Sequence, residues 1–302
     1  MPTGPSTQLA QLNIAKLVAP LDDPRLADFS GNLDRINALA ESSDGFVWRL
    51  KGDGNDATSL RVFPDPTIIV NMSVWRDRES LRAFTYASDH TVFLRRRREF
   101  FVPMETAGLV LWHVRAGHEP TLGECRARIE HLDRHGSGSF AFLFRDRPAE
   151  LVIERCHVDE TNVTAMFNEL DREVVSRNPS EMHDMTLAAE DVAPGNGGLY
   201  LMFVAGEPAG CGAIRRVEGN VGELRRTFVR PPFRGSGLGA AMVSHLCGTA
   251  RDLGIGRVVL ETDTRQPDAQ QRYERAGFNK TTSYGPNRDR PYASFYAKDL
   301  GE

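Results

Sequence analysis

The sequence predicts two consecutive domains, the first of the α+β class and the second a mixed α/β domain. At 302 residues the chain is long enough for two units of ordinary domain size. Two successions of strand-like and helix-like segments meet at residues 145–150, a polar stretch that contains Pro148 and suits a surface connection. The 40% hydrophobic and 26% charged residues are typical of folded cores. We therefore expect one domain over residues 1–148 and another over residues 149–302.

The elements of the first domain follow from its hydrophobic periodicity. Strands are expected at residues 9–18, 45–51, 67–75 and 109–115, and helices at residues 23–41, 78–98 (one or two helices) and 122–135. This order is βαββαβ with a tail, and it usually gives an antiparallel sheet with helices on one face. The other face would then need a partner or a ligand.

The second domain is predicted to begin with a strand and a helix, at residues 151–156 and 160–176. An irregular stretch at 177–198 precedes three strands at 199–205, 209–217 and 222–229, with turns at 206–208 and 218–220. These strands form an antiparallel meander that ends at Val229.

A glycine-rich turn follows the meander and opens a helix that runs to about Leu253. The turn consists of Arg234, Gly235, Ser236, Gly237, Leu238 and Gly239. Leu238, Met242 and Leu246 recur on one helix face, so the helix is amphipathic. Glycines let backbone N–H groups converge, and the helix dipole favours an anion, so a pyrophosphate fits here. An isolated Gly-x-Gly is explained equally well by a tight connection between a strand and a helix.

The residues around the turn form an ordered set of motifs. They are residues 223–229, the turn itself, residues 258–262, residues 266–269 and residues 273–278. Together they resemble the Gcn5-related N-acetyltransferase (GNAT) family over about residues 151–300. The resemblance implies a GNAT acyl-CoA N-acyltransferase fold, with acetyl-CoA as the cosubstrate.

The resemblance also implies which residues bind the cofactor. The end of the fourth strand, at Phe228 and Val229, would splay away from the fifth strand, and its free backbone groups would pair with the pantetheine arm. The backbone amides of residues 234–239 would hold the pyrophosphate. Gln266 stands where many members of the family have asparagine, and it would contact the cofactor there.

Acyl transfer needs a base for the amine and an acid for the departing thiolate. Glu223 resembles the family's general base, which works through water because a carboxylate is a weak base unless it is desolvated. Tyr273 resembles the tyrosine that protonates the sulfur. As alternatives, Glu223 is a plain surface residue of a strand and Tyr273 a core aromatic side chain.

The acceptor site is expected at residues 177–198 and 284–292, which in this fold enclose the amine. Both segments are polar and contain glycine or proline. Residues 287–290, Asn-Arg-Asp-Arg, would meet a charged substrate, or would only make a turn soluble.

The first domain resembles a bacterial family of unknown function. The motifs are residues 74–75, 81–84, 94–101 and 111–118, and the resemblance covers about residues 8–146. That family is assigned to the ferredoxin-like dimeric α+β barrel group, which includes antibiotic-biosynthesis monooxygenases and some haem-degrading enzymes. It implies a homodimer that pairs sheet to sheet. His90, His113 and His118 would line a cavity or bind haem iron, or they are ordinary structural residues.

Composition argues against several other classes of protein. A net charge of −4 and a pI near 6.1 give no general attraction to nucleic acid or anionic membrane. The four cysteines are far apart, without a C-x-x-C pair, so we expect buried thiols and no metal site. Residues 1–10 lack a signal-peptide pattern, and no segment is apolar enough to span a membrane. A cytoplasmic protein is expected.

The sequence thus predicts an enzyme that transfers an acetyl group from acetyl-CoA to a primary amine of a small molecule or a protein. Two alternatives stay open. One is an acyl-CoA sensor without turnover, and the other is a haem-dependent or small-ligand monooxygenase activity in the first domain.

Overall fold

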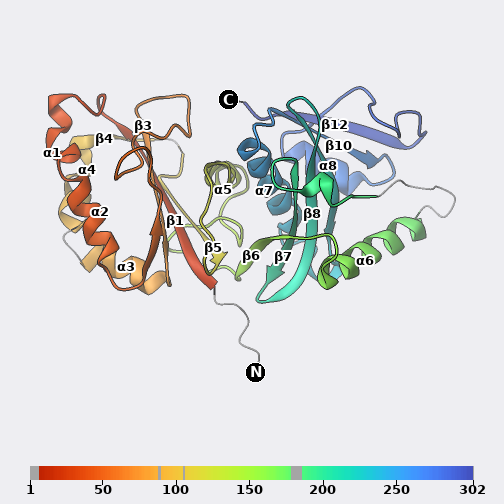
Figure 1. The fold of residues 1–302 in the computed structure, drawn as a ribbon, viewed down its shortest axis with the longest axis horizontal. Coiled ribbons are helices and arrows are strands. Elements are labelled where there is room, and N and C mark those ends of the chain that lie inside the picture. The colour runs from red at the N-terminus through yellow and green to blue at the C-terminus, as the bar shows by residue number, and fades with distance from the viewer. Residues whose placement is uncertain (1–6, 88–89, 105, 178–185, 302) are drawn as a thin grey trace. The chain divides into compact units, whose positions relative to one another are not determined.

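The computed structural model describes residues 7–87, 90–104, 106–177 and 186–301, and its chain divides into two compact units. The first unit holds Met1–Pro120 and Arg128–Pro148, and the second holds Thr121–Ala127 and Ala149–Glu302 (Figure 1). Helix α5 (Leu122–His135) is therefore shared between the two units.

The first unit is built on an antiparallel sheet. Its strands are β1 (Thr7–Leu17), β2 (Phe46–Arg49), β3 (Ile68–Trp75), β4 (Phe101–Val102) and β5 (Leu109–Arg115). The order is β2-β3-β1, and β4 and β5 both pair with β1. These strands and the helices that follow them confirm an α+β domain rich in strands.

The helices of the first unit follow the prediction with one correction. They are η1 (Pro24–Leu26), α1 (Ala27–Ser30), α2 (Leu33–Glu41), α3 (Arg78–Ala87), α4 (His90–Phe100) and α5. The single helix expected at residues 23–41 is broken at Gly31 and Asn32. Glycine is a poor helix former, and the Asn32 side chain donates to the Asp28 carbonyl 2.8 Å away, which competes with helical hydrogen bonding.

The two faces of this sheet have different surroundings. Leu9 and Trp75 pack with Ala40 of α2 and Leu81 of α3. On the opposite face, the Trp112 ring lies under Arg128 of α5, whose guanidinium carbon is 5.4 Å from the ring centroid. That face is thus covered within one chain, and the homodimer that pairs sheet to sheet stays a prediction.

The second unit contains a seven-stranded sheet of mixed direction. Its strands are β6 (Leu151–Cys156), β7 (Gly197–Val204), β8 (Glu207–Glu218), β9 (Val221–Val229), β10 (Arg257–Asp263), β11 (Asn279–Lys280) and β12 (Ala293–Asp299), in the order β11-β12-β10-β9-β8-β7-β6. Strands β6 to β9 form the antiparallel meander that was predicted, and β10 runs parallel to β9. The first hairpin turn is narrower than predicted: β8 already begins at Glu207, because Ala205 and Gly206 both have positive φ and close the turn.

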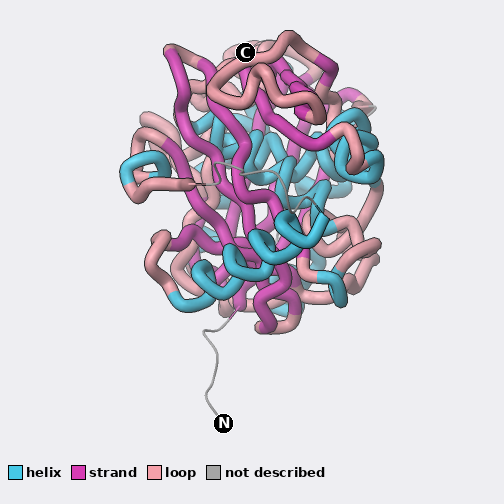
Figure 2. The backbone as a smooth tube through the Cα atoms, turned by 90° about the vertical axis from the view of Figure 1, so that its right-hand side faces the viewer, coloured by secondary structure: helices cyan, strands magenta, loops and turns pink. Residues whose placement is uncertain are grey.

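Helices cover both faces of the second sheet. Val163 and Met166 of α6 (Thr161–Arg177) pack on Leu199, Leu201 and Cys211. The helix α7 (Leu238–Asp252) lies on the other face, where its Thr249 hydroxyl donates to the Tyr200 hydroxyl at 3.1 Å. Figure 2 shows α6 in front of the strands of this sheet. The helix α8 (Pro267–Arg275) follows β10.

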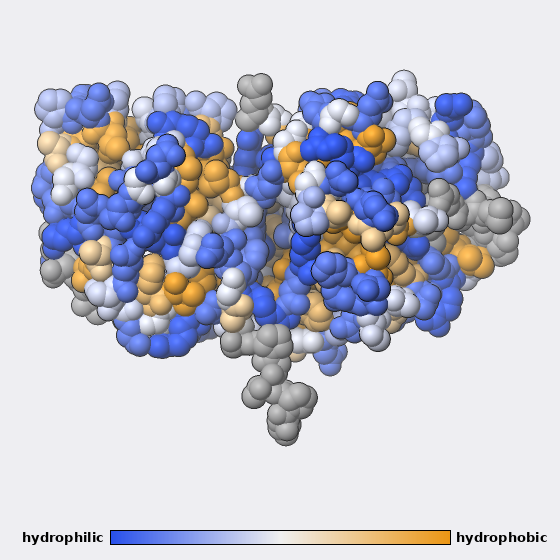
Figure 3. All heavy atoms as spheres, viewed as in Figure 1, coloured by the Kyte–Doolittle hydropathy of each residue, from blue (hydrophilic) through white to orange (hydrophobic). Residues whose placement is uncertain are grey.

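The described residues include no helix that is both long and apolar enough to cross a membrane. On the face drawn in Figure 3, hydrophilic side chains predominate, with smaller groups of hydrophobic ones between them. All four cysteines are buried free thiols, as expected. Burial raises the pKa of Cys156 and Cys211 to about 12, which makes both thiols inert near neutrality.

Candidate functional site

The site begins where two neighbouring strands separate. β9 and β10 pair only between residues 221–223 and 257–259, although β9 continues to Val229 and β10 to Asp263. Beyond Glu223 the two strands diverge, so the edge of β9 that faces β10 has no strand partner there. The splay expected at this end of β9 is thus present.

A β-bulge lies in the separated part of β9. Cys211 of β8 pairs with Phe228 and Ala213 pairs with Arg225, so Arg226 and Thr227 together stand opposite one residue of β8. Arg226 has a φ of 54°, a conformation that is uncommon for a residue with a side chain. A bulge bends its strand and changes the direction of the side chains that follow it. The bulge thus lies beyond the last residue of β9 that pairs with β10.

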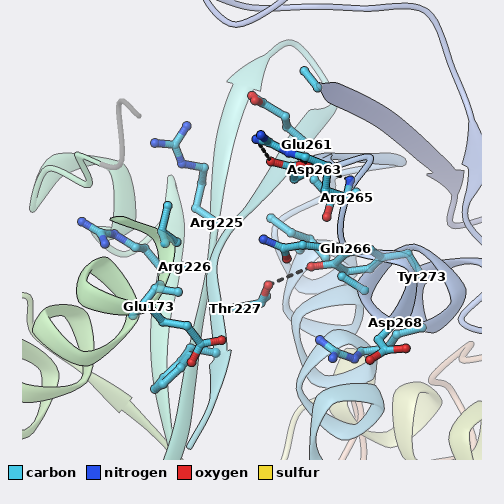
Figure 4. A pocket seen from close by; sticks show the side chains of 18 of the residues that line it. Glu173, Arg225, Arg226, Thr227, Glu261, Asp263, Arg265, Gln266, Asp268 and Tyr273 are labelled. Atoms are coloured by element: carbon cyan, nitrogen blue, oxygen red, sulfur yellow. Dashed lines mark hydrogen bonds and ion pairs between the residues drawn. The ribbon is translucent and has the colours of Figure 1, made fainter. Parts of the chain in front are cut away.

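The gap between the strands is a cavity of about 490 Å³. It is lined by the splayed part of β9, the end of β10, the start of α8, and residues of α6 and of the segment before β12 (Figure 4). The predicted site residues among its lining are Glu223, Phe228, Val229, Arg234, Gln266 and Tyr273. The fold therefore brings both predicted catalytic residues and four of the nine predicted cofactor contacts to one cavity.

The glycine turn lies directly beside this cavity. Gly235 and Gly237 have φ of 80° and 84°, and Gly237 is the N-cap of α7 with no side-chain cap. Within the described part of the chain, the N–H groups of residues 235–239 donate to no backbone carbonyl. These N–H groups stand at the N-terminus of a 15-residue helix, where an anion is stabilised.

Two arginines that line the cavity also lie beside the glycine turn. Arg234 donates to the Val229 carbonyl at 2.9 Å and to Glu173 of α6 at 2.6 Å. Arg272 of α8 lies against Gly239, where an added Cβ would be only 2.8 Å from the Arg272 Nε atom. This contact places a cation beside the turn. No motif in the sequence pointed to Arg272.

Tyr273 faces the bulged strand across the gap. Its hydroxyl lies 2.8 Å from the Thr227 Oγ1 atom, and either group can donate the hydrogen bond (Figure 4). Tyr273 is buried, with 5% of its surface exposed, yet it lines the cavity. A phenol in this position presents a proton to the gap between β9 and α8. Thr227 was not predicted, because its role depends on the bulge.

Glu223 is the last residue of β9 that pairs with β10, and its carboxylate is buried. Arg215 of β8 binds the Oε2 atom, with its Nε and Nη2 atoms at 3.0 and 2.8 Å, and it also contacts Asp191. Arg225 lies 3.7 Å from the same oxygen. The Tyr284 hydroxyl is 3.4 Å from the other oxygen, Oε1. Glu223 is thus no plain surface residue, because two arginines lie at its Oε2 atom and its side chain is buried where it lines the cavity.

A second carboxylate, which the sequence did not single out, lines the same cavity. Asn287 is buried and donates to the Glu261 Oε2 atom at 2.7 Å. Burial, together with Glu223 and Glu261, raises the pKa of the Tyr284 hydroxyl, which therefore stays protonated.

The segments predicted to enclose the acceptor are only partly at the cavity. Of residues 287–290, Asn287 and Arg290 line the cavity, whereas Arg288 and Asp289 form an exposed ion pair at 3.6 Å. The expected acceptor segment 177–198 lies partly outside the described residues.

The surroundings of two of the three predicted histidines are described. His113 packs against Phe142, with ring centroids 5.1 Å apart, and His118 is exposed. The side chain of His90 lies outside the described part of the chain. No group of three or more histidine, cysteine or acidic residues that could hold a metal ion occurs within the described residues. Haem binding by this unit stays a prediction.

Comparison with protein families gives a match for each unit. Residues 8–155 match a domain of unknown function (DUF3291), and residues 163–278 match the acetyltransferase (GNAT) family. The second match covers β7 to β10, the glycine turn and α8.

Comparison with individual proteins gives matches to acetyltransferases over the second unit. The chain is 31% identical over 143 residues to an IAA acetyltransferase of Azospirillum brasilense, which covers 46% of this chain and 90% of that protein. It is 40% identical over 57 residues to an amino-acid acetyltransferase of Mycobacterium tuberculosis, covering 19% of this chain and 33% of that one. Among solved structures, an acetyltransferase of the GNAT family from Staphylococcus aureus is 17% identical, with a TM-score of 0.42, and covers 50% of this chain and 99% of that chain.

Proposed function

Because the chain belongs to the GNAT family of acetyltransferases, we propose that it transfers an acetyl group from acetyl-CoA to a primary amine of a small molecule or a protein. The observation that carries this proposal is the splay between β9 and β10, with the Tyr273 hydroxyl opposite the bulged strand and an uncapped glycine turn beside it. In this arrangement the splay offers a place for a thioester, Tyr273 is a proton donor, and the glycine turn is an anion site.

The proposed cofactor site uses the described residues as follows. The unpaired edge of β9 at Phe228 and Val229 would hydrogen-bond the pantetheine arm as a strand does. The N–H groups of residues 235–239 would hold the pyrophosphate at the start of α7, whereas the Arg234 N–H, which was predicted with them, donates to the Pro231 carbonyl at 3.2 Å. Gln266, at the N-terminus of α8, lines the cavity and would contact the arm. CoA supplies the activated thioester, and the chain supplies its orientation.

The proposed reaction is a direct attack within a ternary complex. The amine nitrogen loses a proton to Glu223 through water and bonds to the thioester carbonyl carbon. The carbon–sulfur bond then breaks, and the thiolate takes the proton of the Tyr273 hydroxyl. The Thr227 hydroxyl at 2.8 Å keeps the phenol pointing into the gap. Proton transfer by a positioned group typically contributes at least a hundredfold to the rate.

The acid role of Tyr273 is tested by the change Tyr273→Phe. We expect kcat to fall about a hundredfold with little change in the KM for acetyl-CoA, measured as CoA thiol release over a panel of amines. Tyr200→Phe is a matched control, because it also removes a buried tyrosine–threonine hydrogen bond, between the Tyr200 and Thr249 hydroxyls, away from the cavity. Unchanged turnover in Tyr273→Phe would show that another group protonates the thiolate.

The base role of Glu223 is tested by Glu223→Gln. This change keeps the shape of the side chain, and we expect kcat to fall at least about tenfold while acetyl-CoA still binds. The control is Glu218→Gln, at the exposed end of β8.

The wild-type protein tests the alternatives to direct acetyl transfer. Protein that binds acetyl-CoA tightly but releases no thiol with any amine would favour a sensor. Release of one equivalent of CoA without an amine would instead indicate an acetyl-enzyme.

A further inference from the structure

The first unit contains a cavity of its own, between the sheet and the helices α2, α3 and α4. Its volume of about 800 Å³ is in the range of cavities that hold small organic ligands. The floor is the face of β1 and β3 that carries the odd-numbered residues, where a helix-covered sheet ordinarily has apolar side chains. Here that face carries a cluster of polar side chains, consisting of Gln11, Asn13, Asn71 and Ser73.

These four side chains form one hydrogen-bonded row. Asn13 stands directly opposite Asn71, and Gln11 directly opposite Ser73. The Asn13 amide donates to Gln11 at 2.9 Å, and the Gln11 amide donates to Asn71 at 3.2 Å and to Ser73 at 3.0 Å. The Trp75 indole also donates to Ser73, at 2.9 Å. Each amide orientation is therefore set relative to that of its neighbour.

The row leaves one acceptor and one donor without a partner, on two side chains that line the cavity. Among the described residues, neither the Asn13 Oδ1 atom nor the Asn71 Nδ2 atom has a hydrogen-bond partner. Both residues are exposed although they lie in the middle of neighbouring strands on the helix-covered face. Reversing every amide in the row would again leave a donor at one asparagine and an acceptor at the other. A molecule with an adjacent donor and acceptor along one edge matches this pair.

The walls of the cavity are aromatic at both ends of the row. At one end Trp75 is stacked on Phe84, with ring centroids 5.1 Å apart. At the other end Phe29 packs against Phe100 and Phe101, at 5.5 and 5.2 Å. Flat, rigid side chains of this kind favour a flat aromatic ligand.

The charges that line the cavity balance, because Arg49 is paired with Glu41, and Asp56 and Arg97 have opposite charges. Arg49 is buried and bound to Glu41 at 2.9 Å and to Asn55 at 2.7 Å. Asp56 accepts hydrogen bonds from the backbone and hydroxyl groups of Thr58. Arg97 is exposed near the end of α4. The cavity is therefore suited to a neutral ligand.

We propose that this cavity binds a neutral, planar heteroaromatic molecule that presents a lactam or imide edge to Asn13 and Asn71. The N–H of the edge donates to Asn13, and its carbonyl oxygen accepts from Asn71. The rings lie among the aromatic walls. This site is separate from the proposed acetyl-transfer site and does not depend on it.

The test uses the full chain and three probes of known structure. Lumichrome and lumazine are planar heterocycles with an imide edge, and phenazine is a planar tricycle without one. Isothermal titration calorimetry should give a Kd below about 1 mM for at least one imide probe, and at least about tenfold weaker binding of phenazine. Failure of both imide probes to bind, or equal binding of phenazine, would overturn the proposal.

Variants locate the binding. Asn13→Leu and Asn71→Leu should each weaken binding of the imide probe at least about tenfold, because the partner group of the probe is left unpaired. Ala15→Phe, which fills the cavity from β1, should abolish it. Asn162→Leu on the exposed start of α6 is the control and should bind like wild type. Tryptophan fluorescence melting verifies that each variant is folded, and wild-type affinity in folded Asn13→Leu and Asn71→Leu would refute the proposal.

Discussion

The side chains of the candidate site take their properties from partners on other strands and helices. Tyr273 depends on Thr227, 46 positions before it, and Glu223 depends on Arg215 of the neighbouring strand. The sequence could suggest Tyr273 and Glu223 from the motifs around them. Their partners are ordinary residue types that become significant only because the bulge and the strand pairing bring them close.

Arg272 gives a prediction at the scale of a single residue. It lines the cavity and lies against Gly239, so its charge should stabilise the pyrophosphate of acetyl-CoA. We expect Arg272→Ala to raise the KM for acetyl-CoA about tenfold with little change in kcat, and the difference should shrink at high salt. Arg275→Ala on the same helix is the control, because Arg275 is exposed and outside the cavity lining. Equal KM values for both variants would show that Arg272 has only a packing role.

At the scale of elements, the site is made by irregularities at the ends of regular structure. The bulge in β9 and the glycine turn before α7 both use backbone with positive φ, at Arg226, Gly235 and Gly237. The turn was recognisable because glycine marks such positions. The bulge was not, because arginine and threonine carry no signal of this kind.

The glycine turn gives a prediction about backbone geometry. Gly237 has a φ of 84°, and no atom lies within 4 Å of the position that an added Cβ would take. Gly237→Ala should therefore cost about 1–2 kcal/mol through backbone strain alone. Gly206 has the same φ and the same open space in the turn between β7 and β8, so Gly206→Ala should cost about the same.

The two variants should differ in binding. Only Gly237→Ala displaces N–H groups of the proposed pyrophosphate site, so calorimetric titration with CoA should show weaker binding in that variant and not in Gly206→Ala. If Gly237→Ala and Gly206→Ala have comparable melting temperatures, backbone strain alone does not explain a difference in their CoA binding. If both variants bind CoA equally well, the turn is only a connection between a strand and a helix.

At the scale of the whole molecule, the two units carry different experimental probes. All three tryptophans, Trp48, Trp75 and Trp112, belong to the first unit. Their fluorescence therefore reports the unfolding of that unit, while release of CoA reports the second. This separation makes it possible to test the stability of one unit and the activity of the other in the same protein.

The first unit should lose stability in mild acid because of His131. Burial, with the nearby cations of His135, Arg128 and Arg134, lowers the pKa of His131 from 6.5 to about 3. The folded unit excludes a proton that the unfolded chain binds, so its stability is highest above pH 6.5 and falls as the pH decreases toward 3. Between pH 7 and pH 5 this histidine should remove about 2 kcal/mol.

Urea unfolding followed by tryptophan fluorescence at the two pH values measures this loss. In His131→Leu the difference between pH 7 and pH 5 should shrink by about the same 2 kcal/mol. His157→Leu removes an exposed histidine of the second unit and should leave the stability difference between pH 7 and pH 5 unchanged. An undiminished difference in His131→Leu would assign the acid sensitivity to other groups.

The sequence by itself determined most of the elements, the class of each unit and the glycine turn at the start of α7. These features depend on residues within one or two turns or strands of each other, where hydrophobic period and glycine positions act directly. The prediction from the sequence was wrong where a continuous helix and a broken helix fit the pattern almost equally well, as at Gly31 and Asn32.

The tertiary structure alone decided the splay of β9 and β10, the pairing of Thr227 with Tyr273, the cation beside Gly239 and the polar row beneath the helices of the first unit. Each depends on which strand lies beside which, and on the side chains that packing then brings together. Such contacts join residues tens of positions apart, and no local pattern encodes them.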